Sequence, residues 1–152
     1  MGTKESGIQE FKFRTEWTQL PWFSSDTSAH WYDIELSPSN VLTAVTCDPS
    51  AATSKVWQYV NGAWSQIGNG VNDKLTAVRW TNGTLTALGA TGIWKFVNSN
   101  WTQVSQKDLS HTMSYDTDAH GDFAFVDTNG NSIVDQNGTW STLPENVVNS
   151  QS

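Results

Sequence analysis

Short runs of alternating apolar and polar residues, separated by tight turn sequences, recur along most of the 152-residue chain. The clearest example is residues 74–104, where LTAVRW, TLTALGA, IWKFV and WTQV follow one another with two- or three-residue links between them. In LTAVRW the side chains alternate with a period of two, which favours a strand over a helix. Links as short as Asn-Gly join neighbouring antiparallel strands. This stretch therefore predicts a four-stranded antiparallel meander.

Other parts of the chain read as copies of this stretch. In residues 30–67, VLTAV, VWQYV and WSQI match TLTAL, IWKFV and WTQV of the central unit. A third unit covers about 112–143, and IQEFKF followed by WTQL predicts half a unit over 7–20. Together these units predict one all-β domain, residues 7–144, between flexible tails at 1–6 and 145–152.

Repetition of small sheets predicts how they pack. A sheet of this size cannot cover its own apolar faces, so the units have to stack on one another. Blades of a β-propeller stack in this way, and a β-trefoil or another antiparallel sandwich is the alternative. The short turns favour the propeller. Roughly 3.5 blade equivalents do not close a ring, which needs at least about four blades, so we expect a homo-oligomer.

Composition excludes some classes of binding partner and some locations. The formal charge of −7 argues against nucleic acid, whose phosphates require a basic face. A single cysteine, Cys47, excludes an intrachain disulfide and predicts a small buried thiol. No run approaches the roughly 20 apolar residues that span a bilayer, so no membrane span is expected. The start MGTKESG has no apolar segment typical of a secretory signal, which favours the cytoplasm without establishing a compartment.

The order of these elements resembles the tectonin-type repeat of small lectin propellers. The resemblance rests on WSQI at 64–67, LTAV at 75–78, the turn glycines Gly83 and Gly92, IWKF at 93–96 and WTQV at 101–104. It extends over most of 7–143 but lacks the Pro-Gly that follows the leading tryptophan strand in that family. The resemblance implies carbohydrate recognition in pockets between adjacent blades. The expected function is a non-catalytic, multivalent lectin for glycans or glycoconjugates. The alternatives are a protein-protein interaction scaffold and a piece of a longer propeller.

Tryptophans supply the candidate binding residues. Sugar binding uses a flat ring against the C–H face of a pyranose, with short polar side chains beside it. The tryptophans that recur in every unit are assigned to packing, and non-repeated rings at strand ends or in loops are the better candidates. The predicted ligand-binding residues are Trp22, Trp31 and Trp80, with Arg79 and Asn82 beside Trp80. Partial burial or an oligomer contact is the alternative role.

Oxygen-bearing side chains in the last unit suggest one metal alternative. Asp127, Asn129, Asn131 and Asp135 occupy positions 1, 3, 5 and 9 of a loop, as ligands do in calcium sites. Ordinary Asn-Gly hairpin chemistry explains the same residues, so no cofactor is expected and calcium stays the alternative. The sequence contains no Gly-x-Ser-x-Gly elbow, phosphate loop or His-Glu zinc motif. We therefore do not expect an enzyme.

Overall fold

A computed structural model describes residues 20, 29–118 and 120–143, and these residues form twelve β-strands and no helix. The predicted half unit, apart from Leu20, lies outside the described residues, as do the two predicted tails and Trp22. Among the residues that the structure describes, no helix is long and apolar enough to cross a membrane.

The strands form three antiparallel meanders of four strands each. The first sheet contains β1 (His30–Leu36), β2 (Leu42–Asp48), β3 (Thr53–Val60) and β4 (Ala63–Gln66). The second contains β5 (Leu75–Thr81), β6 (Thr84–Gly89), β7 (Gly92–Val97) and β8 (Asn100–Gln106). The third contains β9 (Thr112–Thr117), β10 (Phe123–Asp127), β11 (Ser132–Gln136) and β12 (Thr139–Thr142). The three sheets cover nearly the same residues as the three predicted units.

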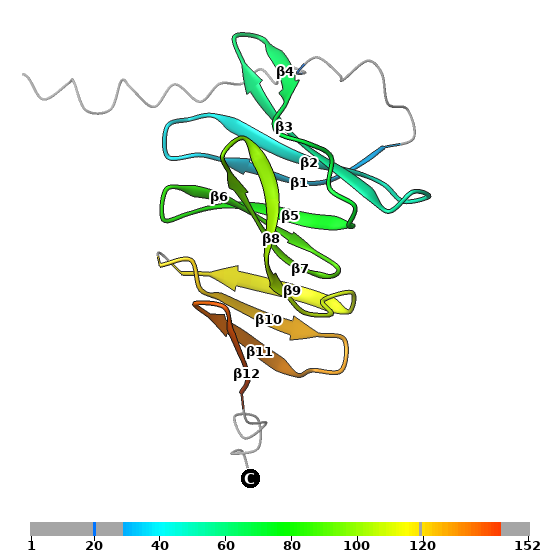
Figure 1. Ribbon diagram of the computed structural model, residues 1–152, viewed down its shortest axis with the longest axis vertical. Helices are drawn as coiled ribbons and strands as arrows, with labels where there is room; N and C mark the ends of the chain where they lie inside the picture. The colour runs from blue at the N-terminus through cyan, green and yellow to red at the C-terminus, as the bar shows by residue number, and fades with distance from the viewer. Residues whose placement is uncertain (1–19, 21–28, 119, 144–152) are drawn as a thin grey trace, which may run out of the picture.

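The sheets stack face to face along the long axis of the molecule, with the second sheet in the middle (Figure 1). We call the contact between the first and second sheets the first interface, and that between the second and third sheets the second interface. The core of the first interface includes Val45, Val56 and Val78, and that of the second includes Leu88 and Phe123. Stacked four-stranded meanders confirm the predicted all-β blades. The β-trefoil alternative is wrong, because the strands form three separate sheets rather than one barrel.

Burial on both faces distinguishes the second sheet. In β6, every residue from Leu85 to Gly89 is buried, because one face packs on the first sheet and the other on the third. The predicted simple alternation along β5 is interrupted by a register shift between Leu75 and Ala77. A bulge of this kind turns the side chains of a strand onto the other face. Leu75 and Ala77 consequently join the cores of different interfaces.

Asparagine sets the hairpin turns, as the sequence predicts. Asn61, Asn82 and Asn137 have φ of 53°, 47° and 51°, and each is followed by a glycine whose φ is also positive. Positive φ at both central residues gives the turn that matches the twist of antiparallel strands. The predicted thiol of Cys47 is free and fully buried.

Candidate functional site

Arg79 lies at the centre of a polar cluster made by β1, β5 and β9, the first strands of the three sheets. Its Nη1 donates to Asp33 Oδ2 at 2.5 Å, and its Nη2 donates to the Tyr115 hydroxyl at 2.5 Å. Glu35 is 3.6 Å from the same guanidinium. Asp33 Oδ2 also accepts the backbone N–H of Val78 at 3.0 Å. One arginine thus connects all three described sheets.

The surroundings of this cluster shift two pKa values upward. Burial is the largest effect on Arg79 and lowers its pKa, but Asp33, Tyr115 and Glu35 together outweigh burial and raise the pKa of Arg79 above its ordinary value. Burial, followed by the charge of Asp33, raises the pKa of Tyr115 to about 12. In this arrangement the Arg79 guanidinium is already bound by side chains of this chain.

The other predicted ligand-binding residues do not gather around one cavity. Trp80 packs against the core of the first interface, and its indole nitrogen is buried without a hydrogen-bond partner. Trp31 contacts the ring of Trp64 edge-on, with the centroids 5.4 Å apart. Asn82 forms a hairpin turn. Trp22 lies outside the described residues.

Two of the recurring tryptophans connect consecutive sheets. The Trp101 indole N–H donates to the Ile67 carbonyl at 3.1 Å, across the first interface. The Trp140 indole N–H donates to Ser105 Oγ at 2.6 Å, across the second interface. Each tryptophan ties its sheet to the preceding one, which is the packing role that repetition predicts.

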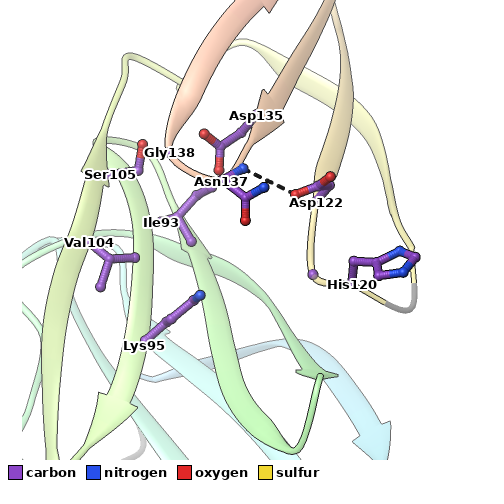
Figure 2. A pocket seen from close by; sticks show the side chains of 10 residues that line it. Ile93, Lys95, Val104, Ser105, His120, Asp122, Asp135, Asn137 and Gly138 are labelled. Atoms are coloured by element: carbon purple, nitrogen blue, oxygen red, sulfur yellow. Dashed lines mark hydrogen bonds between the residues drawn. The ribbon is translucent and has the colours of Figure 1, made fainter.

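A cavity of about 250 Å³ lies at the second interface. The second sheet contributes one wall, and the β9–β10 and β11–β12 connections contribute the other (Figure 2). Its described lining residues are Ile93, Lys95, Val104, Ser105, His120, Gly121, Asp122, Asp135, Asn137 and Gly138. None of them is a tryptophan, tyrosine or phenylalanine, so the predicted stacking of a sugar on a tryptophan does not apply to this cavity.

Hydrogen bonds fix the side of the cavity that the third sheet provides. Asp118 Oδ1 accepts the backbone N–H groups of His120, Gly121 and Asp122 at 2.8, 2.9 and 3.0 Å. The bond from Asp122 is the main cause of the lowered pKa of Asp118. Asp122 Oδ1 in turn accepts the backbone N–H of Asn137 at 3.1 Å, which joins the two connections (Figure 2).

Asp135 is the buried acid of the cavity. The residue is 6% exposed, and its Oδ1 is buried without a hydrogen-bond partner. Burial is the main cause of its raised pKa, and the negative charge of Asp122 adds to it. Lys95 and a hydrogen bond from the Gly138 backbone act in the opposite direction. A ligand that donates to Oδ1 would supply the missing partner.

Strand register explains why the cavity lies at the second interface. The residue that pairs with the recurring tryptophan is aromatic in the first two sheets and acidic in the third: the pairs are Tyr59 with Trp64, Phe96 with Trp101 and Asp135 with Trp140. The first two pairs bring their rings to 5.2 and 5.3 Å between centroids. A carboxylate is far smaller than a phenyl or phenol ring, so the third pair leaves space unfilled.

At the first interface the corresponding space is occupied. Phe96 Cε2 would lie 2.7 Å from a Cβ added to Gly68, so the ring packs directly on the glycine backbone. Gly68 stands four residues after Trp64, and Ser105 stands four residues after Trp101. Ser105 and Asp135 of the second interface therefore take the places of Gly68 and Phe96 in the first.

The four candidate calcium ligands are not brought together. Asp135 pairs with Phe123 at one end of β10, whereas Asp127 ends the strand four residues later, about 13 Å away at ~3.3 Å per residue. Asp127 accepts the backbone N–H groups of Asn129 and Asn131, both through Oδ1, and the Asn131 side chain donates to Oδ2. The Asn131 side chain is the main cause of the lowered pKa of Asp127. Among the described residues, no group of three or more His, Cys, Asp or Glu could hold a metal ion.

Comparison with known proteins bears on the fold. The chain is similar to a crystal structure of a catalytically inactive virginiamycin B lyase from Staphylococcus aureus with quinupristin, with a TM-score of 0.56 and 15% sequence identity. That protein is a β-propeller. The chain described here has a β-propeller fold.

The similarity covers 80% of this chain and 44% of the lyase, so the chain spans less than half of that protein. At this identity the likeness concerns the fold alone. No protein-family model matches the sequence, and no curated protein matches it.

Sequence reasoning missed the residues that line the cavity, apart from Asp135, which it considered as a metal ligand. The available signal was the third unit itself, which places an acid where the other units place an aromatic residue beside the tryptophan. Asp33 and Tyr115 of the polar cluster around Arg79 carried no such signal, because their approach to Arg79 depends on how the sheets stack.

Proposed function

We propose that this chain is a non-catalytic carbohydrate-binding module whose site is the cavity at the second interface. The observation that carries the proposal is a cavity between two blades that combines a polar set of side chains with an unpartnered buried carboxylate oxygen. Sugar hydroxyls both donate and accept hydrogen bonds, so they suit a site with carboxylates on one side and an ammonium on the other.

The shape and walls of the cavity fit a small polar ligand. Its volume of about 250 Å³ is below the range of about 300–1,000 Å³ that holds drug-sized ligands. Ile93 and Val104 provide an apolar wall for C–H groups, and Lys95, Asp122 and Asp135 provide the polar contacts. A single sugar ring at the end of a glycan matches this combination.

We also propose that copies of the chain associate, which would give the module several sites and increase its avidity. The outer face of the third sheet supports this proposal. Ala124 and Val126 are exposed there, whereas Thr86 and Leu88, which hold the same places in the second sheet, are buried. A second copy is the occupant that fits this face best, because stacked sheets of this repeat cover the same positions.

A glycan array with the labelled full chain tests the proposed function. The expected result is binding to a defined set of terminal sugars that is competed by the free monosaccharide. Absence of binding to every glycan would remove the carbohydrate proposal and leave a protein-interaction scaffold as the remaining candidate. Light scattering over a range of protein concentrations tests association, and a monomer at every concentration would overturn that part.

A further inference from the structure

The charge balance of the cavity suggests what kind of sugar it takes. Two carboxylates, Asp122 and Asp135, face one ammonium, Lys95, across it. Within the described part of the chain, no ion pair joins Lys95 to either carboxylate. The imidazole of His120 also borders the cavity, but its side chain is 87% exposed and contacts Asp118. The interior of the cavity therefore has an excess of negative charge.

Asp135 differs from an ordinary surface acid in two ways. Its backbone is fixed near the end of β11 by pairing with Phe123 on one side and Trp140 on the other. Its free Oδ1 has lost water without gaining a protein donor, and such a loss is unfavourable for a charged group. A donor that also brings positive charge would relieve both the missing hydrogen bond and the repulsion from Asp122.

We propose that this cavity binds the protonated amine of an amino sugar, with Asp135 as the residue that accepts its N–H, and that the three described sheets contain one such site. The proposal rests on the carbohydrate-binding function proposed above. Lys95 is placed to donate to a ring or hydroxyl oxygen at the other side of the same sugar (Figure 2).

The single site follows from the repeat. Tyr59 and Phe96 hold the place of Asp135 in the other sheets, and Phe96 fills the corresponding space at the first interface with its ring. A site defined by this carboxylate is therefore not copied with the repeat. This feature separates the proposal from the expectation of equivalent pockets between all blades.

Isothermal titration calorimetry with matched sugars tests the proposal on the full chain. Glucosamine is compared with glucose and N-acetylglucosamine, and galactosamine with galactose and N-acetylgalactosamine. Within each set the sugars differ only at one ring position, which carries a charged amine, a neutral hydroxyl or a neutral amide. For at least one of the two sets, we expect the free amine to bind about tenfold or more tightly than both neutral sugars, with one site per chain. A charge-assisted hydrogen bond is roughly twice as strong as a neutral one, which gives a preference of this order.

Two variants and one control assign the preference to Asp135. Asp135→Asn keeps the shape and removes the charge, so the preference for the amine should fall to about twofold or less. Lys95→Met removes both a hydrogen bond to the sugar and a positive charge that competes with the amine, so it should weaken the neutral sugars and raise the preference for the amine over them by a few fold. Asp116→Asn makes the same change in charge at an exposed residue outside the cavity and should leave binding unchanged.

The outcomes separate this inference from the proposed function. Neutral sugars that bind as tightly as the amines would overturn the inference and leave the carbohydrate module standing. No binding of any sugar would overturn both. A preference that persists in Asp135→Asn, or that Asp116→Asn abolishes equally, would show a general attraction of cations to an acidic protein and overturn the inference. More than one equivalent site per chain would contradict the single site.

Discussion

The first and second interfaces join sheets of the same construction, but one is filled and the other contains a cavity. At the first interface, the ring of Phe96 packs on Gly68 and Trp101. At the second, Asp135 and Ser105 take the corresponding places, and Trp140 reaches Ser105 by a hydrogen bond. Two exchanges, an aromatic residue for an acid and a glycine for a serine, thus separate a packing contact from a candidate binding site.

This difference suggests how a repeat fold can acquire a site without changing its backbone. The tryptophan contact that ties each sheet to the preceding one is present at both interfaces. The residue beside the tryptophan varies, and its size decides whether the space is filled. Because the surrounding strands are fixed by their own pairing, the loss of one ring leaves a cavity rather than a collapsed interface.

The largest effect is expected from making the first interface resemble the second. Phe96→Asp removes a ring packed on Trp101 and places a carboxylate beside it, so the free energy of unfolding should fall by about 3 kcal/mol. Urea denaturation followed by circular dichroism measures this change. Val97→Asp, at an exposed neighbouring position, is the control and should change stability by about 0.5 kcal/mol or less. Equal effects of the two variants would contradict a packing role for Phe96.

Arg79 should affect both interfaces at once, because it binds side chains from the first and third sheets. Arg79→Met leaves Asp33 and Glu35 without their cation. The guanidinium is partly exposed, so we expect a loss of about 2 kcal/mol rather than the larger value of a fully buried pair. Urea denaturation measures this too, with Tyr115→Phe as the milder variant that removes only one hydroxyl. A loss within error of zero would show that the cluster does not hold the sheets together.

Asp135→Asn should stabilise the folded protein at neutral pH by about 1 kcal/mol, since it removes a buried charge that lacks a full set of partners. The pKa of Asp135 is raised in the folded state, so the folded protein holds this proton more tightly than the unfolded chain. Wild-type stability from this group is therefore present at low pH and is lost as pH rises through the folded pKa. The gain from Asp135→Asn should therefore shrink as pH falls through the folded pKa of Asp135 and should be lost below about 4, the ordinary pKa of an aspartate. Thermal unfolding across this range checks the trend, and a gain independent of pH would contradict it.

The smallest expected effect is spectroscopic. Tyr115 should ionise with a pKa of about 12, above the ordinary value of about 10. Stability linked to this raised pKa is lost as pH rises between those two values. Ultraviolet absorbance at high pH should show a phenol that ionises near pH 12, and this component should be absent in Tyr115→Phe. A titration curve near pH 12 that Tyr115→Phe leaves unchanged would contradict the burial of Tyr115 near Asp33.

The fold was largely predictable, because its signals are local. Asn-Gly turns and alternating runs define each hairpin, and repetition of the runs requires the sheets to stack. The site was less predictable. Arg79 stood out beside Trp80, but its partner Asp33 is 46 positions away in the sequence. The rings of Trp31 and Trp80 stood out as non-repeated, yet one packs on Trp64 and the other on the core.

Asp135 is a site residue that the sequence singled out for the wrong reason. Its spacing from Asp127, Asn129 and Asn131 suggested a calcium loop, but the hairpin places Asp127 at the opposite end of β10. The significance of Asp135 comes from its pairing with Trp140 on the neighbouring strand. An alignment of the repeats would have shown that the other two units have an aromatic residue in the place of Asp135. Pairing register, rather than spacing along the chain, identifies it.

A crystal structure of the Asp135→Phe/Ser105→Gly double variant tests most directly whether these two residues create the cavity, because the Cβ of Ser105 would meet the introduced ring where Gly68 leaves room for Phe96. The introduced ring should pack against Trp140 with centroids about 5–6 Å apart, as is usual for aromatic pairs and as Phe96 and Trp101 do at 5.3 Å. The cavity between the second and third sheets should then be filled, with the backbone unchanged. A ring turned out to solvent above a cavity of unchanged size would contradict the account.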